Sequence, residues 1–448
     1  MELHRAPLRK ELPTLSFPFL RELPAPAGWR CYLLEDTSTT LVVCQLLFPV
    51  GSIHAEQPGL ARLTLRSLLR GTRRLRAEEF HTRLEAYGAT LQISVGREWS
   101  SVSCVCLHSV WGEVSRLIQE LLAEPALSPE EVLRERQRQV AALLEWCQEP
   151  ESLARYALFQ LWAPGHPYSI PVLGSLPALL ELTAEECHRW FESTFRQAVP
   201  RFLLMGGMVT EDEVRRWVEQ LGGVFAGGGF TPSFPPLPQW EGRRVAVIAK
   251  ESAVQSALAL GLPAPTPAEE AYAAAYTTAA YLGGHFLSRL NRRLREQEGL
   301  TYGVSALTRA FRTGGLVLVE GSFALDRAGE VCASILEELE QLRDSCIPVD
   351  ELQRVVRVIY GSFLRGLVTV QGALGLYATL LIHGLPSDFL QHFLERLRHL
   401  QPEELLAVQR HYFAPDRAII AVSGETEQLS SQLASFGKLY HIPSACDG

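Results

Sequence analysis

The 448-residue sequence has few lysines and no long apolar run. Lys10, Lys250 and Lys438 are the only lysines among 42 basic residues, and 50 acidic residues bring the net charge to −8. This balance argues against a nucleic-acid footprint. No apolar run reaches the roughly 18 residues that a membrane-spanning helix needs. The segment MELHRAPLRKELPTLSF lacks the apolar core of a signal peptide. We therefore expect a cytoplasmic protein with neither nucleic-acid nor membrane partners.

Motifs for metal binding and nucleophilic catalysis are also missing. No two of the twelve histidines have His-x-x-x-His or His-x-x-Glu-His spacing, and no Gly-x-Ser-x-Gly occurs. The glycine run at 227–229 is not followed by Gly-Lys-Ser/Thr, which excludes a phosphate loop. No pair of the nine cysteines has Cys-x-x-Cys spacing. We expect them to be free, mostly buried thiols in a reducing cytoplasm.

The length and an internal repeat predict two domains. Hydrophobic residues make up 47% and charged residues 21% of the chain, as in ordinary folded proteins. The stretch at 201–223 and the stretch at 417–437 share one pattern, an apolar strand followed by a helix. The segment 226–239, rich in glycine and proline, separates the two halves. We predict an α+β protein of two homologous α/β-sandwich domains, 1–225 and 240–448, joined by this linker.

Local signals place several helices. Ser128 and Pro129 predict a helix start, and Glu131 completes a capping box with Ser128. Thr210 predicts the cap of another helix. The segment HFLSRLNRRLREQEG, residues 285–299, is also predicted to be helical.

The stretch GLARLTLRSLLRGT, residues 59–72, resembles the zinc-binding helix of the pitrilysin/insulinase (M16) metallopeptidases. That helix carries His-x-x-Glu-His, in which two histidines hold zinc and the glutamate activates its water. Arg62, Leu65 and Arg66 stand in those places here. A protonated arginine offers no lone pair to zinc, and a leucine takes no proton. If the resemblance holds, the chain has the fold of the protease without its metal.

A second stretch, ERQRQVAALLEWCQEP, residues 135–150, resembles the family's Glu-Arg helix. The third zinc ligand of the family is a glutamate seven residues after the glutamate of that pair, which here is Ala142. Glu145 lies nearly one turn further on and would face elsewhere. The resemblance thus implies that every zinc ligand and the catalytic base are gone.

A third stretch, LGGHFLSRLNRRLREQEGLTYGVSA, residues 282–306, resembles the substrate-contacting segment of the family. The family's arginine and tyrosine, seven residues apart, correspond to Arg295 and Tyr302. In active enzymes that pair binds a substrate carbonyl and stabilises the oxyanion. The alternative is a surface ion pair of Arg295 with Glu296 or Glu298, and a Tyr302 ring packed on a strand.

Together these stretches resemble the non-catalytic subunit of a two-domain, M16B-type heterodimer. The resemblance implies a proteolytically inactive chain with no cofactor of its own, paired with a His-x-x-Glu-His partner that carries zinc. Arg295 and Tyr302 would then contact a peptide, for example a leader or a ribosomally made precursor. Residues 283–284 are too short for the glycine-rich loop of the mitochondrial subunit. Two other functions stay open: a structural core protein, as in the cytochrome bc1 complex, and a homodimeric peptide-binding module.

Two further features have alternative interpretations. Arg62, Arg66 and Arg70 form a basic stripe at i, i+4 and i+8. The stripe is either a solvated face or a surface that faces the chamber and attracts acidic peptide or partner carboxylates. His285, beside the Gly-Gly turn, is either a structural residue or a second residue facing the chamber.

Overall fold

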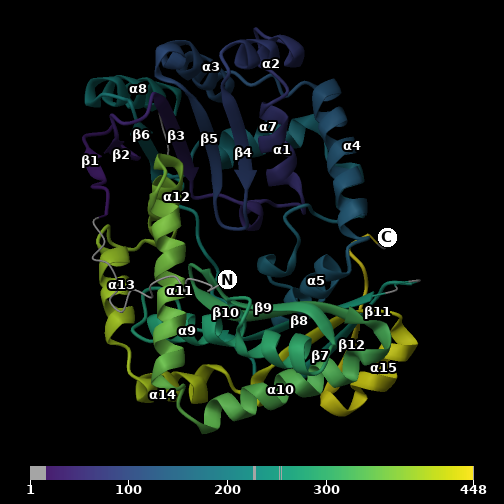
Figure 1. Cartoon of the computed structure of the whole chain (residues 1–448). Coiled ribbons are helices and arrows are strands. Elements are labelled where there is room, and N and C mark those ends of the chain that lie inside the picture. The colour runs from purple at the N-terminus through teal and green to yellow at the C-terminus, as the bar shows by residue number, and fades with distance from the viewer. Residues whose placement is uncertain (1–16, 226–228, 252, 254, 447–448) are drawn as a thin grey trace, which may run out of the picture.

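The computed structural model describes residues 17–225, 229–251, 253 and 255–446. Residues 1–16 of the predicted first domain and 226–228 of the predicted linker therefore lie outside the described residues. Residues 231–243 contain no regular helix or strand. The rest of the described chain forms two six-stranded sheets, each with helices on both faces (Figure 1).

The two sheets share one strand order. The first sheet runs β1-β2-β6-β3-β5-β4 and the second β12-β7-β11-β8-β10-β9. β2 pairs with β6 in parallel, as β7 does with β11, and β3 and β8 run antiparallel to their neighbours. The repeat and the α+β class are thus confirmed. The strands are β1 (Arg21–Leu23), β2 (Trp29–Glu35), β3 (Leu41–Phe48), β4 (Thr90–Val95), β5 (Ser100–Leu107), β6 (Arg201–Gly207), β7 (Arg244–Ala249), β8 (Gln255–Ala264), β9 (Thr301–Phe311), β10 (Gly314–Ala324), β11 (Ile419–Gly424) and β12 (Lys438–Ile442).

The helices also repeat, one set per half. The first half contains α1 (Leu60–Leu68), α2 (Ala77–Ala86), α3 (Trp111–Ala123), α4 (Pro129–Trp146), α5 (Pro150–Trp162), α6 (Leu176–Glu181), α7 (Ala184–Trp190) and α8 (Glu211–Val224). The second contains α9 (Tyr272–Gly283), α10 (Ala328–Asp344), α11 (Val349–Leu367), α12 (Val370–His383), α13 (Phe389–His399), α14 (Pro402–Tyr412) and α15 (Thr426–Leu433).

The two halves exchange one helix each. Strand residues alternate between the faces of their sheet, and both faces are buried. In the first sheet, Cys31 and Leu33 face α1, α3 and α8, whereas Tyr32 and Leu34 pack against α12 of the second half. In the second sheet, α5 of the first half covers the equivalent face (Figure 1). Each domain core is therefore completed by a helix from the other half of the chain.

The predicted helix over residues 285–299 is only partly correct. Residues 285–288 form a turn flanked by bends, residues 289–290 are helical, and the segment Asn291–Gln297 is a π-helix. Before them, α9 ends at Gly283, where the helix lies so close to β9 that a Cβ atom would be 2.4 Å from the backbone nitrogen of Ala306. This close approach requires glycine at position 283.

The predicted caps are largely confirmed. The Ser128 side chain accepts a hydrogen bond from the backbone nitrogen of Glu131, and Thr210 and Glu213 form a full capping box. The predicted box at Ser128 is incomplete, because the Glu131 carboxylate is bound by Arg70 and Arg134 instead. The ion pair of Glu131 with Arg70 thus takes the place of the local hydrogen bond that the Glu131 carboxylate would accept from the Ser128 backbone.

The expectation that all cysteines are free is wrong. Cys147, at the end of α4, forms a disulfide with Cys446, and the other seven cysteines are free. The bond joins the tail that follows β12 of the second domain to the first domain, across 299 residues of sequence. No sequence spacing signals a pair so far apart.

None of the described helices alone combines the length and apolar character needed to cross a bilayer. α11 and α12 together satisfy that test of length and composition, but the chain bends by 114° between them.

Candidate functional site

Gly59 and Gln139 fix the start of α1, the helix that resembles a zinc helix. Gly59 has a φ of +86°, and a Cβ atom there would lie within 3.0 Å of Leu179 and Gln139 atoms and of the Leu173 carbonyl. The Gln139 amide, from α4, donates to the carbonyls of Gly59 and Leu173 at 3.1 and 2.8 Å. Only glycine allows this close crossing of α1 and α4.

The three positions that resemble the zinc motif differ in their surroundings. Leu65 is fully buried in the first core, so its side chain packs as an ordinary hydrophobic residue. Arg62 and Arg66 are half-buried on the face of α1 that is not packed into the core. Arg66 Nε lies 3.7 Å from the Glu135 carboxylate, which is almost completely buried. Burial and the neighbouring Arg66 lower the pKa of the Arg62 guanidinium, an effect that Glu135 partly offsets.

These residues do not fit a zinc ion. Ala142, at the place of the third ligand, offers no donor atom, and the two guanidiniums offer no lone pair. Throughout the described ranges, no group of three or more His, Cys, Asp or Glu side chains is placed to hold a metal. In place of a metal site, this part of the first domain has two arginines, Arg62 and Arg66, beside the Glu135 carboxylate.

The basic stripe turns out to be mostly an internal contact between α1 and α4. Arg70 Nε donates to Glu131 at 3.0 Å, and both side chains are largely buried. Arg66, one turn before Arg70, approaches Glu135, which lies one turn after Glu131 on α4. The solvated-face interpretation is therefore wrong for Arg70 and only partly right for Arg66.

Arg295 lies in the π-helical segment and stacks on Phe286. The Arg295 guanidinium carbon is 3.6 Å from the centroid of the Phe286 ring. Its Nη2 donates to the Phe286 carbonyl at 3.2 Å and to Glu296 at 2.8 Å. The predicted alternative of an ion pair with Glu296 is present, whereas Glu298 binds Arg293. Nε and Nη1 of Arg295 make no hydrogen bond within the described chain.

Tyr302 is the second residue of β9, the edge strand of the second sheet, and is not packed on it. Its side chain is 91% exposed, so the alternative of a packed ring is wrong. Arg295 and Tyr302 line one pocket of about 550 Å³, together with residues 299–301, the start of β8 and the end of β10. The structure thus brings the two predicted residues to a shared, accessible pocket.

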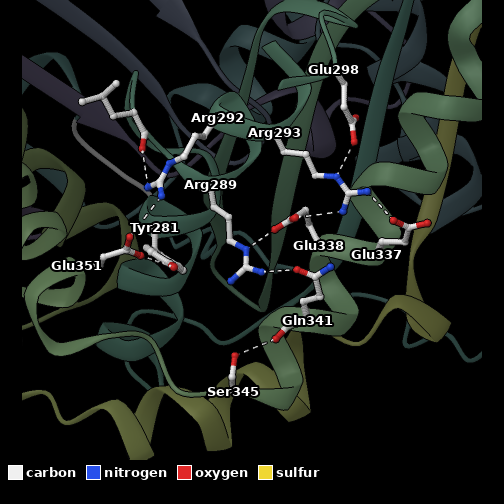
Figure 2. Close-up of polar contacts among 11 residues, drawn as sticks. Tyr281, Arg289, Arg292, Arg293, Glu298, Glu337, Glu338, Gln341, Ser345 and Glu351 are labelled. Atoms are coloured by element: carbon white, nitrogen blue, oxygen red, sulfur yellow. Dashed lines mark hydrogen bonds and ion pairs between the residues drawn. The ribbon is translucent and has the colours of Figure 1, made fainter. Parts of the chain in front are cut away.

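A network of arginines and carboxylates anchors the segment that carries Arg295 (Figure 2). Arg293 donates to Glu298 at 2.8 Å, to Glu338 at 3.1 Å and to Glu337 at 2.5 Å. Burial by itself would lower the pKa of the Arg293 guanidinium, but these ion pairs outweigh it and raise the pKa. Arg289 binds Glu338 and the Gln341 amide oxygen on the same helix, α10. Two arginines spaced one turn apart therefore bind a single buried carboxylate, that of Glu338.

A second branch of the network reaches α11. Tyr281 donates its hydroxyl to Glu351 at 2.6 Å, and Arg292 approaches the other oxygen of Glu351 at 3.4 Å (Figure 2). The π-helical segment is thereby tied to two helices behind it.

His285 lies beside this segment and is half-buried. Burial and the charges of Arg292 and Arg354 lower its pKa, so the imidazole is neutral at pH 7. The described chain offers its buried Nε2 no hydrogen-bond partner. His285 does not line the pocket of Arg295 and Tyr302.

Family comparisons explain this combination of features. The family model for insulinase, peptidase family M16, matches residues 30–174, and the model for the peptidase M16 inactive domain matches residues 181–359. This chain belongs to the M16 family. The resemblance of residues 59–72, 135–150 and 282–306 is thereby confirmed at the level of the family.

Relatives of this M16 chain include both peptidases and non-peptidases. An uncharacterized zinc protease of Streptomyces coelicolor is 23% identical over 430 residues, 92% of each chain. A non-peptidase homolog of Helicobacter pylori is 21% identical over 371 residues, 80% of this chain and 85% of the relative. A crystal structure of a peptidase M16 inactive domain from Pseudomonas fluorescens superposes with a TM-score of 0.82 at 19% identity, over 91% of this chain and 98% of that one. The last similarity concerns the fold.

Four positions that resemble the family's zinc site are replaced in this chain, and residues 181–359 match the family model of the M16 inactive domain. Two residues that contribute to these sites, Glu135 and Glu338, carry no signal of that role in the sequence. In the sequence, Glu135 marks only the start of the stretch 135–150 that resembles the family's Glu-Arg helix. The structure shows that it is the buried partner of Arg66. Glu338 carries no motif, and its contacts with Arg289 and Arg293 depend on helix packing that sequence spacing does not reveal.

Proposed function

We propose that this chain is the metal-free subunit of a heterodimeric M16 zinc peptidase. In this function the partner carries His-x-x-Glu-His and zinc, and this chain helps to bind and orient an extended peptide. The proposal rests mainly on one contrast: the zinc positions hold Arg62, Leu65, Arg66 and Ala142, whereas Arg295 and Tyr302 line a common pocket.

Hydrogen-bond donors at that pocket that have no partner among the described residues support a role in peptide binding. Nε and Nη1 of Arg295, together with the Tyr302 hydroxyl, make no hydrogen bond to other described residues and can donate to a peptide carbonyl. Stacking on Phe286 and the contact with Glu296 hold the guanidinium in one orientation before substrate arrives. Donors fixed in advance stabilise the oxyanion that forms as a carbonyl is attacked.

Co-purification with a zinc-bearing M16 chain encoded nearby, followed by cleavage of unstructured peptides, tests the proposal. We expect no cleavage by this chain alone and zinc-dependent cleavage by the pair. Arg295→Ala or Tyr302→Phe should lower kcat/KM by about 100-fold, the usual loss for one oxyanion donor. Arg357→Ala, which changes an exposed arginine of α11 outside the pocket, is the control.

Three outcomes would contradict the proposal. The first is zinc-dependent cleavage by this chain alone. The second is unchanged kcat/KM in both variants of an intact complex, checked by light scattering. The third is a failure of the two chains to associate, which would favour the scaffold or the homodimeric peptide-binding module.

A further inference from the structure

The arginine pair on α1 carries more positive charge than its surroundings neutralise. Arg62 and Arg66 lie one turn apart on one face of the helix. Among the described residues, Glu135 is the one carboxylate that lies within 4.0 Å of Arg66, and its charge also acts on Arg62. No hydrogen bond or ion pair of Arg62 occurs in the part of the chain that the structure describes. An excess of one positive charge therefore remains at this half-buried position.

Arg66 also has an N–H group that its contact with Glu135 leaves without a hydrogen bond. Arg66 Nε is buried and has no hydrogen-bond partner among the described residues, because 3.7 Å from the carboxylate is too long for a hydrogen bond. Arg70, the next arginine of the stripe, donates from its Nε to Glu131 at 3.0 Å, and both side chains are largely buried. Among the described residues, the arginines of the stripe without a hydrogen bond to a carboxylate are thus Arg62 and Arg66.

We propose that Arg62 and Arg66 form a binding site for a carboxylate of an extended peptide. Guanidinium groups bind a carboxylate through two parallel N–H···O bonds, and a half-buried setting strengthens such bonds relative to exposed ones. The place that resembles a metal site has become an anion site. This site belongs to the first domain of this chain, and it requires neither the zinc-bearing partner nor Arg295 and Tyr302.

Peptide binding to the purified full chain alone tests this inference. The probes are fluorescein-labelled ten-residue peptides of Gly, Ser and Val with an amidated C-terminus, which carry either three Glu or three Gln. Fluorescence anisotropy at about 20 mM salt limits screening of the contact. We expect the Glu peptide to bind about five- to tenfold more tightly than the Gln peptide. A third peptide, the Gln sequence with a free C-terminus, distinguishes a terminal carboxylate from an acidic side chain.

Three variants identify the residues. Arg62→Gln, which keeps the Arg66–Glu135 contact, should abolish the preference for Glu. Glu135→Gln removes the competing internal carboxylate, so it should increase the preference, an effect that loss of structure would not produce. Arg73→Gln/Arg74→Gln removes two exposed charges beyond α1 and is the matched control for net charge.

The inference is overturned if the parent chain binds neither the Glu peptide nor the free C-terminus more tightly than the amidated Gln peptide. It is also overturned if Arg62→Gln retains the preference, or if Arg73→Gln/Arg74→Gln loses it to the same extent. Because the partner is absent from these measurements, failure here leaves the heterodimer proposal standing, and the converse also holds.

Discussion

At the scale of single residues, Glu98 is a buried carboxylate where the two halves meet. Glu98 is 6% exposed, accepts a hydrogen bond from the Tyr168 hydroxyl, and accepts another from the Arg312 backbone nitrogen at 2.9 Å. Tyr168 follows α5, and Arg312 lies in the β9–β10 turn of the second sheet. Burial raises the pKa of Glu98, although the two hydrogen bonds offset part of this effect.

The raised pKa predicts a pH-dependent stability. The folded chain binds the Glu98 proton more tightly than the unfolded chain does. This stabilisation is complete below the ordinary glutamate pKa and is lost as the pH rises through the raised pKa. We expect Glu98→Gln, which keeps an acceptor oxygen, to reduce the loss of unfolding free energy over that window. Urea denaturation at a series of pH values measures it.

A change at an exposed glutamate of α2, Glu78→Gln, is the control for the pH series. Its profile should match that of the parent. If Glu98→Gln also matches the parent, Glu98 does not contribute to the pH dependence of folding.

At the scale of elements, the π-helical segment Asn291–Gln297 depends on ion pairs rather than on regular helical continuation. Arg293 is 17% exposed and binds three carboxylates, one of which, on Glu338, is only 8% exposed. Removing one partner of a largely buried pair leaves an uncompensated charge behind. The segment that positions Arg295 should therefore be sensitive to changes at Arg293.

We expect Arg293→Gln to lower the free energy of unfolding by about 2–4 kcal/mol, because Glu338 would retain only Arg289. Arg292→Gln removes an exposed contact of 3.4 Å and should cost less than about 1 kcal/mol. Urea denaturation of both variants beside the parent measures the difference. Equal losses in the two variants would show that the network does not anchor the segment.

At the scale of the whole molecule, the two domains are held together by exchanged helices and one disulfide. α12 and α5 fill one face of the sheet in the opposite half, and Cys147–Cys446 ties the tail after β12 to α4. A bond that closes so long a segment restricts the unfolded chain, which raises the free energy of the unfolded state.

We expect Cys446→Ser to lower the free energy of unfolding by about 2–4 kcal/mol under non-reducing conditions. Cys346→Ser, which changes an exposed free thiol, should stay within about 0.5 kcal/mol of the parent. Peptide mapping without reductant should recover the two linked peptides. Recovery of both cysteines as free thiols from oxidised protein would contradict the pairing.

The elements were predictable where local chemistry decides them. Ser128 and Thr210 marked real helix starts, and the repeated pattern of an apolar strand followed by a helix marked the equivalent strands β6 and β11. The π-helix was not predictable, because its residues have ordinary helical propensity and the ion pairs of Arg289 and Arg293 with Glu338 join residues far apart in the chain. For the candidate site, the sequence indicated Arg295 and Tyr302. It did not show that Tyr302 is exposed, because that exposure depends on the position of β9 at the edge of the second sheet.

The sequence by itself indicated the repeat, the α+β class and the residues that replace the zinc site in the stretches resembling the family, because apolar patterns and side-chain donor chemistry are properties of the residues themselves. Only the tertiary structure decided that α5 and α12 change places, that Arg66 faces Glu135, and that Cys147 meets Cys446. The physical reason is that these contacts join residues far apart in the chain, and their partners are set by how two whole domains pack.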